Sequence, residues 1–190
     1  MTNRHKTIIA FTGIGITLLY FVVVTGYFIV QTPIMFRLWE VLIILSAPVI
    51  LLVLIALLDS ADTTKAGYKM AAIAFMACAT AVTAAAHYPN VISRSEVAAG
   101  MIPNDILAWG LFLGLAFLFT SAALPTPSSH AQPSRQVARL KLVTAICGSL
   151  CLLGLLGPIL NIELLWFIAV LGYGLGVPVI CVMLLRLWRA

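Results

Sequence analysis

Three ionisable side chains, Glu40, His87 and Asp105, lie in or beside long apolar stretches of the sequence. A charged group inside a membrane-spanning segment is costly, and where one occurs it usually has a function. An imidazole beside two carboxylates could bind a divalent metal ion or perform acid–base chemistry, for example on a lipid headgroup. The three residues are therefore the candidate catalytic residues and, as the same site, the candidate metal ligands.

The elements that must position these residues are six apolar segments. A helix needs about 20 apolar residues to cross about 30 Å of hydrocarbon. The sequence contains six such runs, at about 7–30, 35–58, 68–88, 105–124, 140–160 and 162–185. Each run is continuous, whereas a barrel strand has about ten residues of alternating polarity. We therefore predict an all-α integral membrane bundle of six transmembrane helices, forming one transmembrane domain over residues 1–190.

The composition supports a membrane environment. Of the 190 residues, 63% are hydrophobic and only 9% are charged, whereas a soluble domain has about 25% charged residues. So few charges cannot cover a water-facing surface of this size. Residues 125–137, PTPSSHAQPSRQV, are rich in proline and serine and predict a flexible linker between the fourth and fifth helices.

The distribution of lysine and arginine predicts the orientation in the membrane. Six spans alternate so that nine of the eleven basic residues fall on one side: Arg4, Lys6, Lys65, Lys69, Arg135, Arg139, Lys141, Arg186 and Arg189. Loops rich in these residues stay in the cytoplasm. We expect both termini to be cytoplasmic and the protein to lie in the inner (plasma) membrane. The net charge of +5 then reflects topology and contact with membrane lipids, and it implies no nucleic-acid partner.

Small residues indicate where helices approach one another closely. The run 68–88 is so rich in alanine that we expect its helix to be central, surrounded by the first, second and fourth helices. Gly110 with Gly114, and Gly172 with Gly176, have the small-xxx-small spacing. That spacing suits packing against other membrane subunits or against a second copy of the chain.

An ordinary structural explanation of the three candidate residues stays open. Asp105 suits the first turn of a helix, where a negative charge is favourable. His87, followed by Tyr88 and Pro89, resembles a helix end. Glu40 could pair with Arg37, one turn earlier on the same helix.

Two cofactor classes are argued against by the residues available. A haem bundle needs axial ligands at membrane depth, and His5 and His130 fall in predicted cytoplasmic segments, which leaves His87 alone. A retinal protein needs a Schiff-base lysine in a late helix, and Lys141 lies at a helix end.

Part of the sequence resembles a family of uncharacterised bacterial multi-pass, six-helix membrane proteins. In this pattern, a W-E pair and an S-A-P motif lie in one span, and the next span carries A-F-M and ends in a histidine. The matching residues here are Trp39, Glu40, Ser46, Ala47, Pro48, Ala74, Phe75, Met76 and His87. The resemblance implies a bacterial inner-membrane protein of undetermined activity and directs attention to Glu40 and His87.

Three functions remain open at this point. The first is a non-enzymatic bundle, either an accessory subunit or a protein that binds a lipid or small molecule. The second is a membrane-embedded enzyme or metal-dependent protein with an outward-facing site at Glu40, His87 and Asp105. The third is a small oligomeric transporter with a pathway near Pro48 and Pro178, where kinks are expected.

Overall fold

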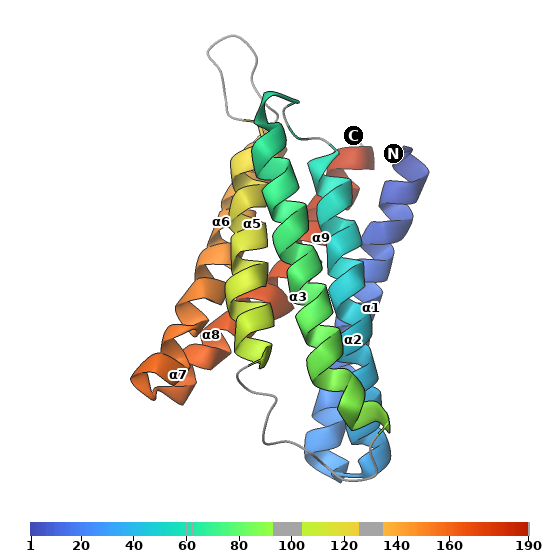
Figure 1. Cartoon of the computed structure of the whole chain (residues 1–190). Helices are drawn as coiled ribbons and strands as arrows, with labels where there is room; N and C mark the ends of the chain where they lie inside the picture. The colour runs from blue at the N-terminus through green and yellow to red at the C-terminus, as the bar shows by residue number, and fades with distance from the viewer. Residues whose placement is uncertain (60, 62, 93–103, 126–134, 190) are drawn as a thin grey trace.

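The computed structural model describes residues 1–59, 61, 63–92, 104–125 and 135–189, and every regular element in these ranges is helical. Six helices or helix pairs are long and apolar enough to cross a membrane (Figure 1). The elements are α1 (Asn3–Val30), α2 (Pro33–Leu58), η1 (Thr63–Lys65), α3 (Ala66–Ile92), η3 (Ile106–Phe112), α5 (Leu113–Ala123), α6 (Arg135–Gly154), α7 (Leu156–Leu160), α8 (Glu163–Gly174) and α9 (Gly176–Arg189).

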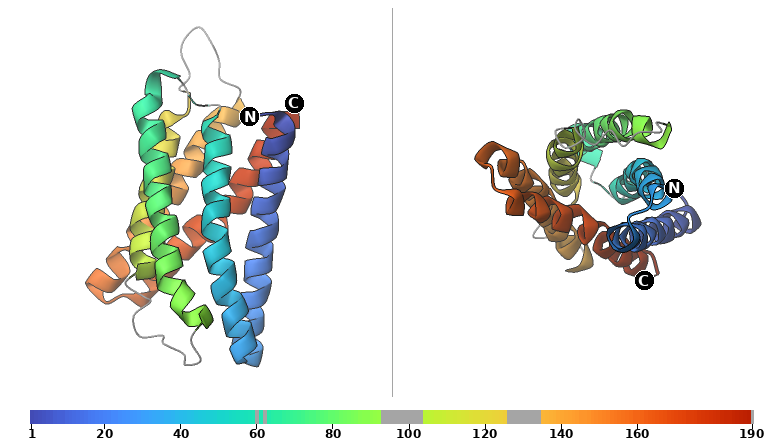
Figure 2. Two further views of the ribbon diagram at one scale, coloured as in Figure 1. Left: turned by 45° about the vertical axis from the view of Figure 1, so that its right-hand side comes forward. Right: turned by 90° about the horizontal axis from the view of Figure 1, so that it is seen from below.

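The helices pack as a closed ring of neighbours. α1 packs on α2, α2 on α3, α3 on α5, α5 on α6 and α6 on α8, and α9 returns to α1. α8 and α9 run obliquely across the bundle, so that the end of α9 lies beside the start of α1 (Figures 1 and 2). The two chain ends are therefore at the same end of the bundle, as an even number of long helices requires.

Basic side chains hold the helices together at this end. The Lys6 ammonium lies 2.7 Å from an Asp59 carboxylate oxygen, just after α2. It also lies 5.7 Å from the centre of the Trp188 ring on α9, within the range of a cation–π contact. Lys65 donates to the Leu124 carbonyl oxygen at the end of α5. The Lys6 contacts tie the ends of α1, α2 and α9 together, and the Lys65 contact ties η1 to the end of α5.

The alanine-rich helix α3 is not central, and our expectation for it is wrong. Its buried residues form one stripe, Ala72, Met76, Ala79, Thr83, His87 and Asn90, which faces α2 and the helix η3–α5. Ala74, Ala77, Ala81 and Ala85 are exposed on the opposite face. α2 and the η3–α5 helix are the more buried spans, because each has packing partners on more of its circumference.

The four glycines with small-xxx-small spacing are used inside the chain. A Cβ atom at Gly114 would lie 3.1 Å from the Gly148 carbonyl oxygen, and one at Gly110 would lie 2.7 Å from Leu155. Gly172 and Gly176 approach Cys147 on α6 just as closely. The close approach that these glycines allow is therefore between α6 and the helices η3, α5, α8 and α9, and these surfaces are not open to a second copy.

The last two spans are each interrupted at an equivalent place. In GLLGP (154–158) the helix is interrupted at Leu155, between α6 and α7. In GLGVP (174–178) it is interrupted at Leu175, between α8 and α9. Proline has no backbone N–H, so Pro158 and Pro178 cannot bond to the carbonyls of Gly154 and Gly174, four residues earlier. The span predicted at 140–160 is thus two helices, and its first helix begins earlier, at Arg135.

Replacing Gly148 by alanine should destabilise the bundle. The new Cβ would lie 2.8 Å from the Gly114 carbonyl oxygen and 3.0 Å from the Leu118 nitrogen, so the backbones of α5 and α6 must separate. We expect a loss of about 1–3 kcal/mol in unfolding free energy, measured by denaturant titration of the detergent-solubilised protein. Gly15→Ala is the matched control, because nothing lies within 4 Å of that position. Equal effects of the two changes would contradict the packing described.

Stability in acid should depend on Asp59. The hydrogen bond from Lys6, followed by that from the N-terminal amino group, holds the pKa of Asp59 below its usual 3.8. A lowered pKa gives stability that is present above pH 4 or so and is lost as the pH falls through the lowered value. Thermal unfolding midpoints of the wild type and Asp59→Asn should therefore differ at pH 7 and converge below about pH 4. A constant difference down to pH 3 would contradict this origin.

Candidate functional site

A buried imidazole joins two carboxylates at the end of the bundle away from the chain termini. His87 Nδ1 lies 2.7 Å from Glu40 Oε2, and His87 Nε2 lies 2.6 Å from Asp105 Oδ1. Asn90 donates a further hydrogen bond of 3.2 Å to the same Glu40 oxygen. Glu40 and His87 have no exposed surface, whereas the Asp105 side chain is 22% exposed. We call Glu40, His87 and Asp105 the triad.

The triad depends on α3 extending further than the sequence indicated. The H-Y-P-N segment suggested a helix end at 88, but α3 continues through Pro89 to Ile92. The extra turn places Asn90 on the same face as His87, and both side chains reach Glu40 on α2. Hydrogen bonds to a buried carboxylate stabilise this turn and offset the backbone bond that Pro89 cannot make.

Asp105 reaches His87 from a third element. It is the residue that precedes η3, in which the helix widens into a π-helical segment over Ile106–Phe112. Short π-helical segments are rare and occur frequently at functional sites. Here the segment also carries Trp109, which is buried and packs on Tyr173 of α8 with ring centres 5.1 Å apart.

The structure thus brings together the three residues that the sequence singled out. The Glu40 carboxylate forms hydrogen bonds with His87 and Asn90. The metal hypothesis gains no support, because each ring nitrogen of His87 already faces a carboxylate oxygen. Within the described ranges, no group of three or more His, Cys, Asp or Glu side chains has an arrangement that could hold a metal ion.

The hydrogen bonds of the triad define its minimum proton content. Each of the two contacts with His87 needs one proton, whereas neutral imidazole supplies only one. Two protons shared among one imidazole and two carboxylates leave a net charge of −1. The lengths of 2.7 and 2.6 Å are typical of charge-assisted hydrogen bonds. The triad can therefore pass a proton between Asp105 and Glu40 through the two ring nitrogens.

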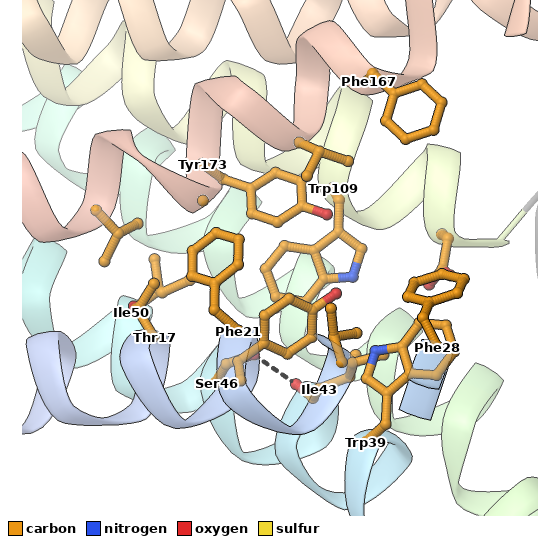
Figure 3. Close-up of a pocket in the computed structure, with 16 residues that line it drawn as sticks. Thr17, Phe21, Phe28, Trp39, Ile43, Ser46, Ile50, Trp109, Phe167 and Tyr173 are labelled. Carbon is orange, nitrogen blue, oxygen red and sulfur yellow. Dashed lines mark hydrogen bonds between the residues drawn. The ribbon is translucent and has the colours of Figure 1, made fainter. Parts of the chain in front are cut away.

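Asp105 also lies in the wall of a pocket of about 360 Å³. This volume is within the range of small-molecule sites, about 300–1,000 Å³. We call it the aromatic pocket, because the described residues that line it include seven aromatic side chains (Figure 3): Tyr20, Phe21, Phe28, Trp39, Trp109, Phe167 and Tyr173. Asp105 is the charged member of the described lining.

The aromatic pocket is formed by faces of several helices. α1 contributes Thr17, Tyr20, Phe21, Val24 and Phe28, and α2 contributes Trp39, Ile43, Ser46 and Ile50. Both sets recur every three or four residues and so form one face of each helix. The hydroxyls of Thr17 and Ser46 bond to carbonyls of their own helices, at Gly13 and Ile43, which leaves these faces largely apolar.

The rim of the aromatic pocket reaches the outer surface of the bundle. Phe28 on α1 is 66% exposed and Phe167 on α8 is 60% exposed. The sequence did not predict this pocket. Two stripes in the sequence could have indicated it, because Tyr20, Val24 and Phe28, and likewise Trp39, Ile43 and Ser46, recur every three or four residues on one helix face. Such stripes usually form ordinary helix–helix contacts, and only the separation of α1 from α8 makes them a cavity wall.

The chain matches no protein-family model, no curated protein and no solved structure.

Glu40 and His87 should show strong energetic coupling. Removing either partner leaves the other buried without its hydrogen bond, so Glu40→Gln and His87→Gln should each destabilise, but not additively. We expect an interaction energy of about 0.5–3 kcal/mol in a double-mutant cycle of unfolding free energies. Glu40→Gln with Asp59→Asn is the control pair, separated by about 28 Å along α2, and should be additive. Additivity of the Glu40 and His87 changes would contradict a functional hydrogen bond between them.

Proposed function

We propose that the protein is an integral membrane protein that binds a small lipophilic molecule in the aromatic pocket. The observation that carries the proposal is that Asp105 belongs both to the triad and to the pocket wall. A binding site that is mostly apolar, with few fixed polar groups, is the usual form of a small-molecule site. The triad fixes the orientation of the Asp105 carboxylate, and the aromatic rings supply the apolar surface.

The position of the pocket rim supports entry from the bilayer. Phe28 and Phe167 lie on the outer surface of helices that are long and apolar enough to span a membrane. A lipophilic molecule dissolved in the hydrocarbon would meet this rim directly.

The proposed location is the bacterial inner membrane, with both chain ends in the cytoplasm. The support is the resemblance described above and the gathering of basic residues at the end that holds Lys6, Lys65 and Arg186. The triad and Arg37 lie toward the opposite end of α2. Lysine and arginine are retained on the cytoplasmic side during insertion, which would turn the triad toward the outer side.

A second candidate function is acid–base chemistry on the bound molecule. The specific support is that Asp105 is partly exposed to the pocket while His87 connects it to Glu40. Asp105 would exchange a proton with the ligand, and His87 would restore it from Glu40. This candidate needs the same pocket and therefore depends on ligand binding.

A larger side chain in the pocket wall should weaken binding. We expect the full-length protein in maltoside micelles to bind 1-aminoanthracene, a neutral apolar fluorophore, with a rise in its fluorescence above that of empty micelles. Val24→Trp places an indole in the pocket and should weaken binding at least about tenfold, or 1.4 kcal/mol.

The matched control is Val22→Trp, two residues away on the same helix, where valine is 68% exposed on the outer face. Its affinity should equal that of the wild type. Failure of the wild type to bind the fluorophore, or equal loss in the two variants, would contradict a ligand site in the aromatic pocket.

A further inference from the structure

We infer that the molecule held in the aromatic pocket is an organic cation, with an alkylammonium or quaternary ammonium group beside Asp105. The inference rests on the proposed function and names the class of ligand. Its basis is the combination of a negatively charged triad with a wall of aromatic rings.

The net charge of the triad favours a cation. With the two protons that the hydrogen bonds of His87 require, the triad carries a net charge of −1, in a part of the bundle where Glu40 and His87 are buried. A net charge in a medium of low polarity is costly. Asn90 adds a neutral donor to Glu40 and leaves the charge unchanged. A cation in the pocket beside Asp105 would compensate the charge at the point where the triad is accessible.

The aromatic rings of the pocket wall also favour a cation. Aromatic faces attract cations through their electron density, and Trp gives the strongest attraction. The wall has two tryptophans, and they come from different sides: Trp39 from α2 and Trp109 from η3. Tyr173 packs on Trp109, and Phe28 lies 6.3 Å from Trp39 between ring centres. Figure 3 shows Tyr173 beside Trp109, with Trp39 and Phe28 together to one side of them, rather than all four rings in a single stack.

The described lining of the pocket contains no basic side chain that would compete with a cation for Asp105. Its other polar groups are hydroxyls and indole N–H groups, and Asp105 is the charged side chain among the described residues of the wall. Lys6 and Lys65 pair near the opposite end of the bundle, with Asp59 and with the Leu124 carbonyl. An anionic ligand would meet the Asp105 carboxylate without a described basic group in the wall to offset it.

The experiment compares two ligands of the same shape that differ in charge. Benzyltrimethylammonium and neopentylbenzene are isosteres, with nitrogen in the first replaced by carbon in the second. Each is used to displace 1-aminoanthracene from the full-length protein in uncharged maltoside micelles, so that no lipid charge concentrates the cation. The cation should displace the fluorophore at a concentration at least about tenfold lower than the neutral isostere, which corresponds to 1.4 kcal/mol.

Two variants identify the source of the preference. Asp105→Asn should reduce the preference to less than about threefold, with the fluorophore added at a concentration matched to its affinity for that variant. Asp59→Asn removes a carboxylate outside the pocket and should keep the full preference. Both predictions concern the ratio of the two displacing concentrations, so a uniform change in affinity does not affect them.

The outcomes separate the inference from the proposed function. If the fluorophore does not bind, the ligand site itself is wrong. If it binds and the isosteres displace it equally, the site stands and the cation is wrong. A preference that survives in Asp105→Asn also overturns the inference, because the triad charge is then not its cause.

Two sources of the cation are distinguished in the same assay. Diheptanoylphosphatidylcholine carries the trimethylammonium group on a lipid, and diheptanoylphosphatidylglycerol is its counterpart without a cation. Selective displacement by the choline lipid as well as by benzyltrimethylammonium indicates a lipid headgroup. Displacement by benzyltrimethylammonium alone indicates a free organic cation.

Discussion

The hydrogen bonds of His87 to Glu40 and Asp105 are the constraint on which the end of the bundle away from the chain termini depends. A carboxylate with no exposed surface needs a donor, and Glu40 finds one on a different helix. Meeting this need fixes the rotation of α3, draws the start of η3 toward α2 and stabilises the turn of α3 beyond Pro89. The same need directs Asp105 into the wall of the aromatic pocket.

The two ends of the bundle use charge in different ways. At the end with the chain termini, Lys6 pairs with Asp59 and contacts Trp188, and these contacts hold helix ends together. Toward the other end, an imidazole between two carboxylates, with the two protons that its hydrogen bonds require, carries a net negative charge beside a cavity. Ion pairs of the first kind contribute modestly to stability. A buried charge of the second kind is costly, and this cost is the reason to assign it a ligand.

Helix packing explains why the cavity exists where it does. Gly148 and Gly114 let α5 and α6 approach closely, and Gly172 lets α8 do the same. α8 therefore packs against α6 on one side of the bundle. The chain turns at Leu175, and α9 packs against α1. α9 joins the end of α8 to α1. The aromatic side chains of α1, α2, η3 and α8 line the space between α8 and α1.

The sequence by itself determined the six apolar spans and the candidate triad, because span length and the rarity of ionisable residues in apolar runs are local properties. The tertiary structure decided which faces meet. It placed the alanines of α3 partly on the outer surface and turned Gly110 and Gly172 inward, since a small side chain suits either environment. It alone created the aromatic pocket, because a cavity is defined by the spacing between helices, which no single stretch of sequence encodes.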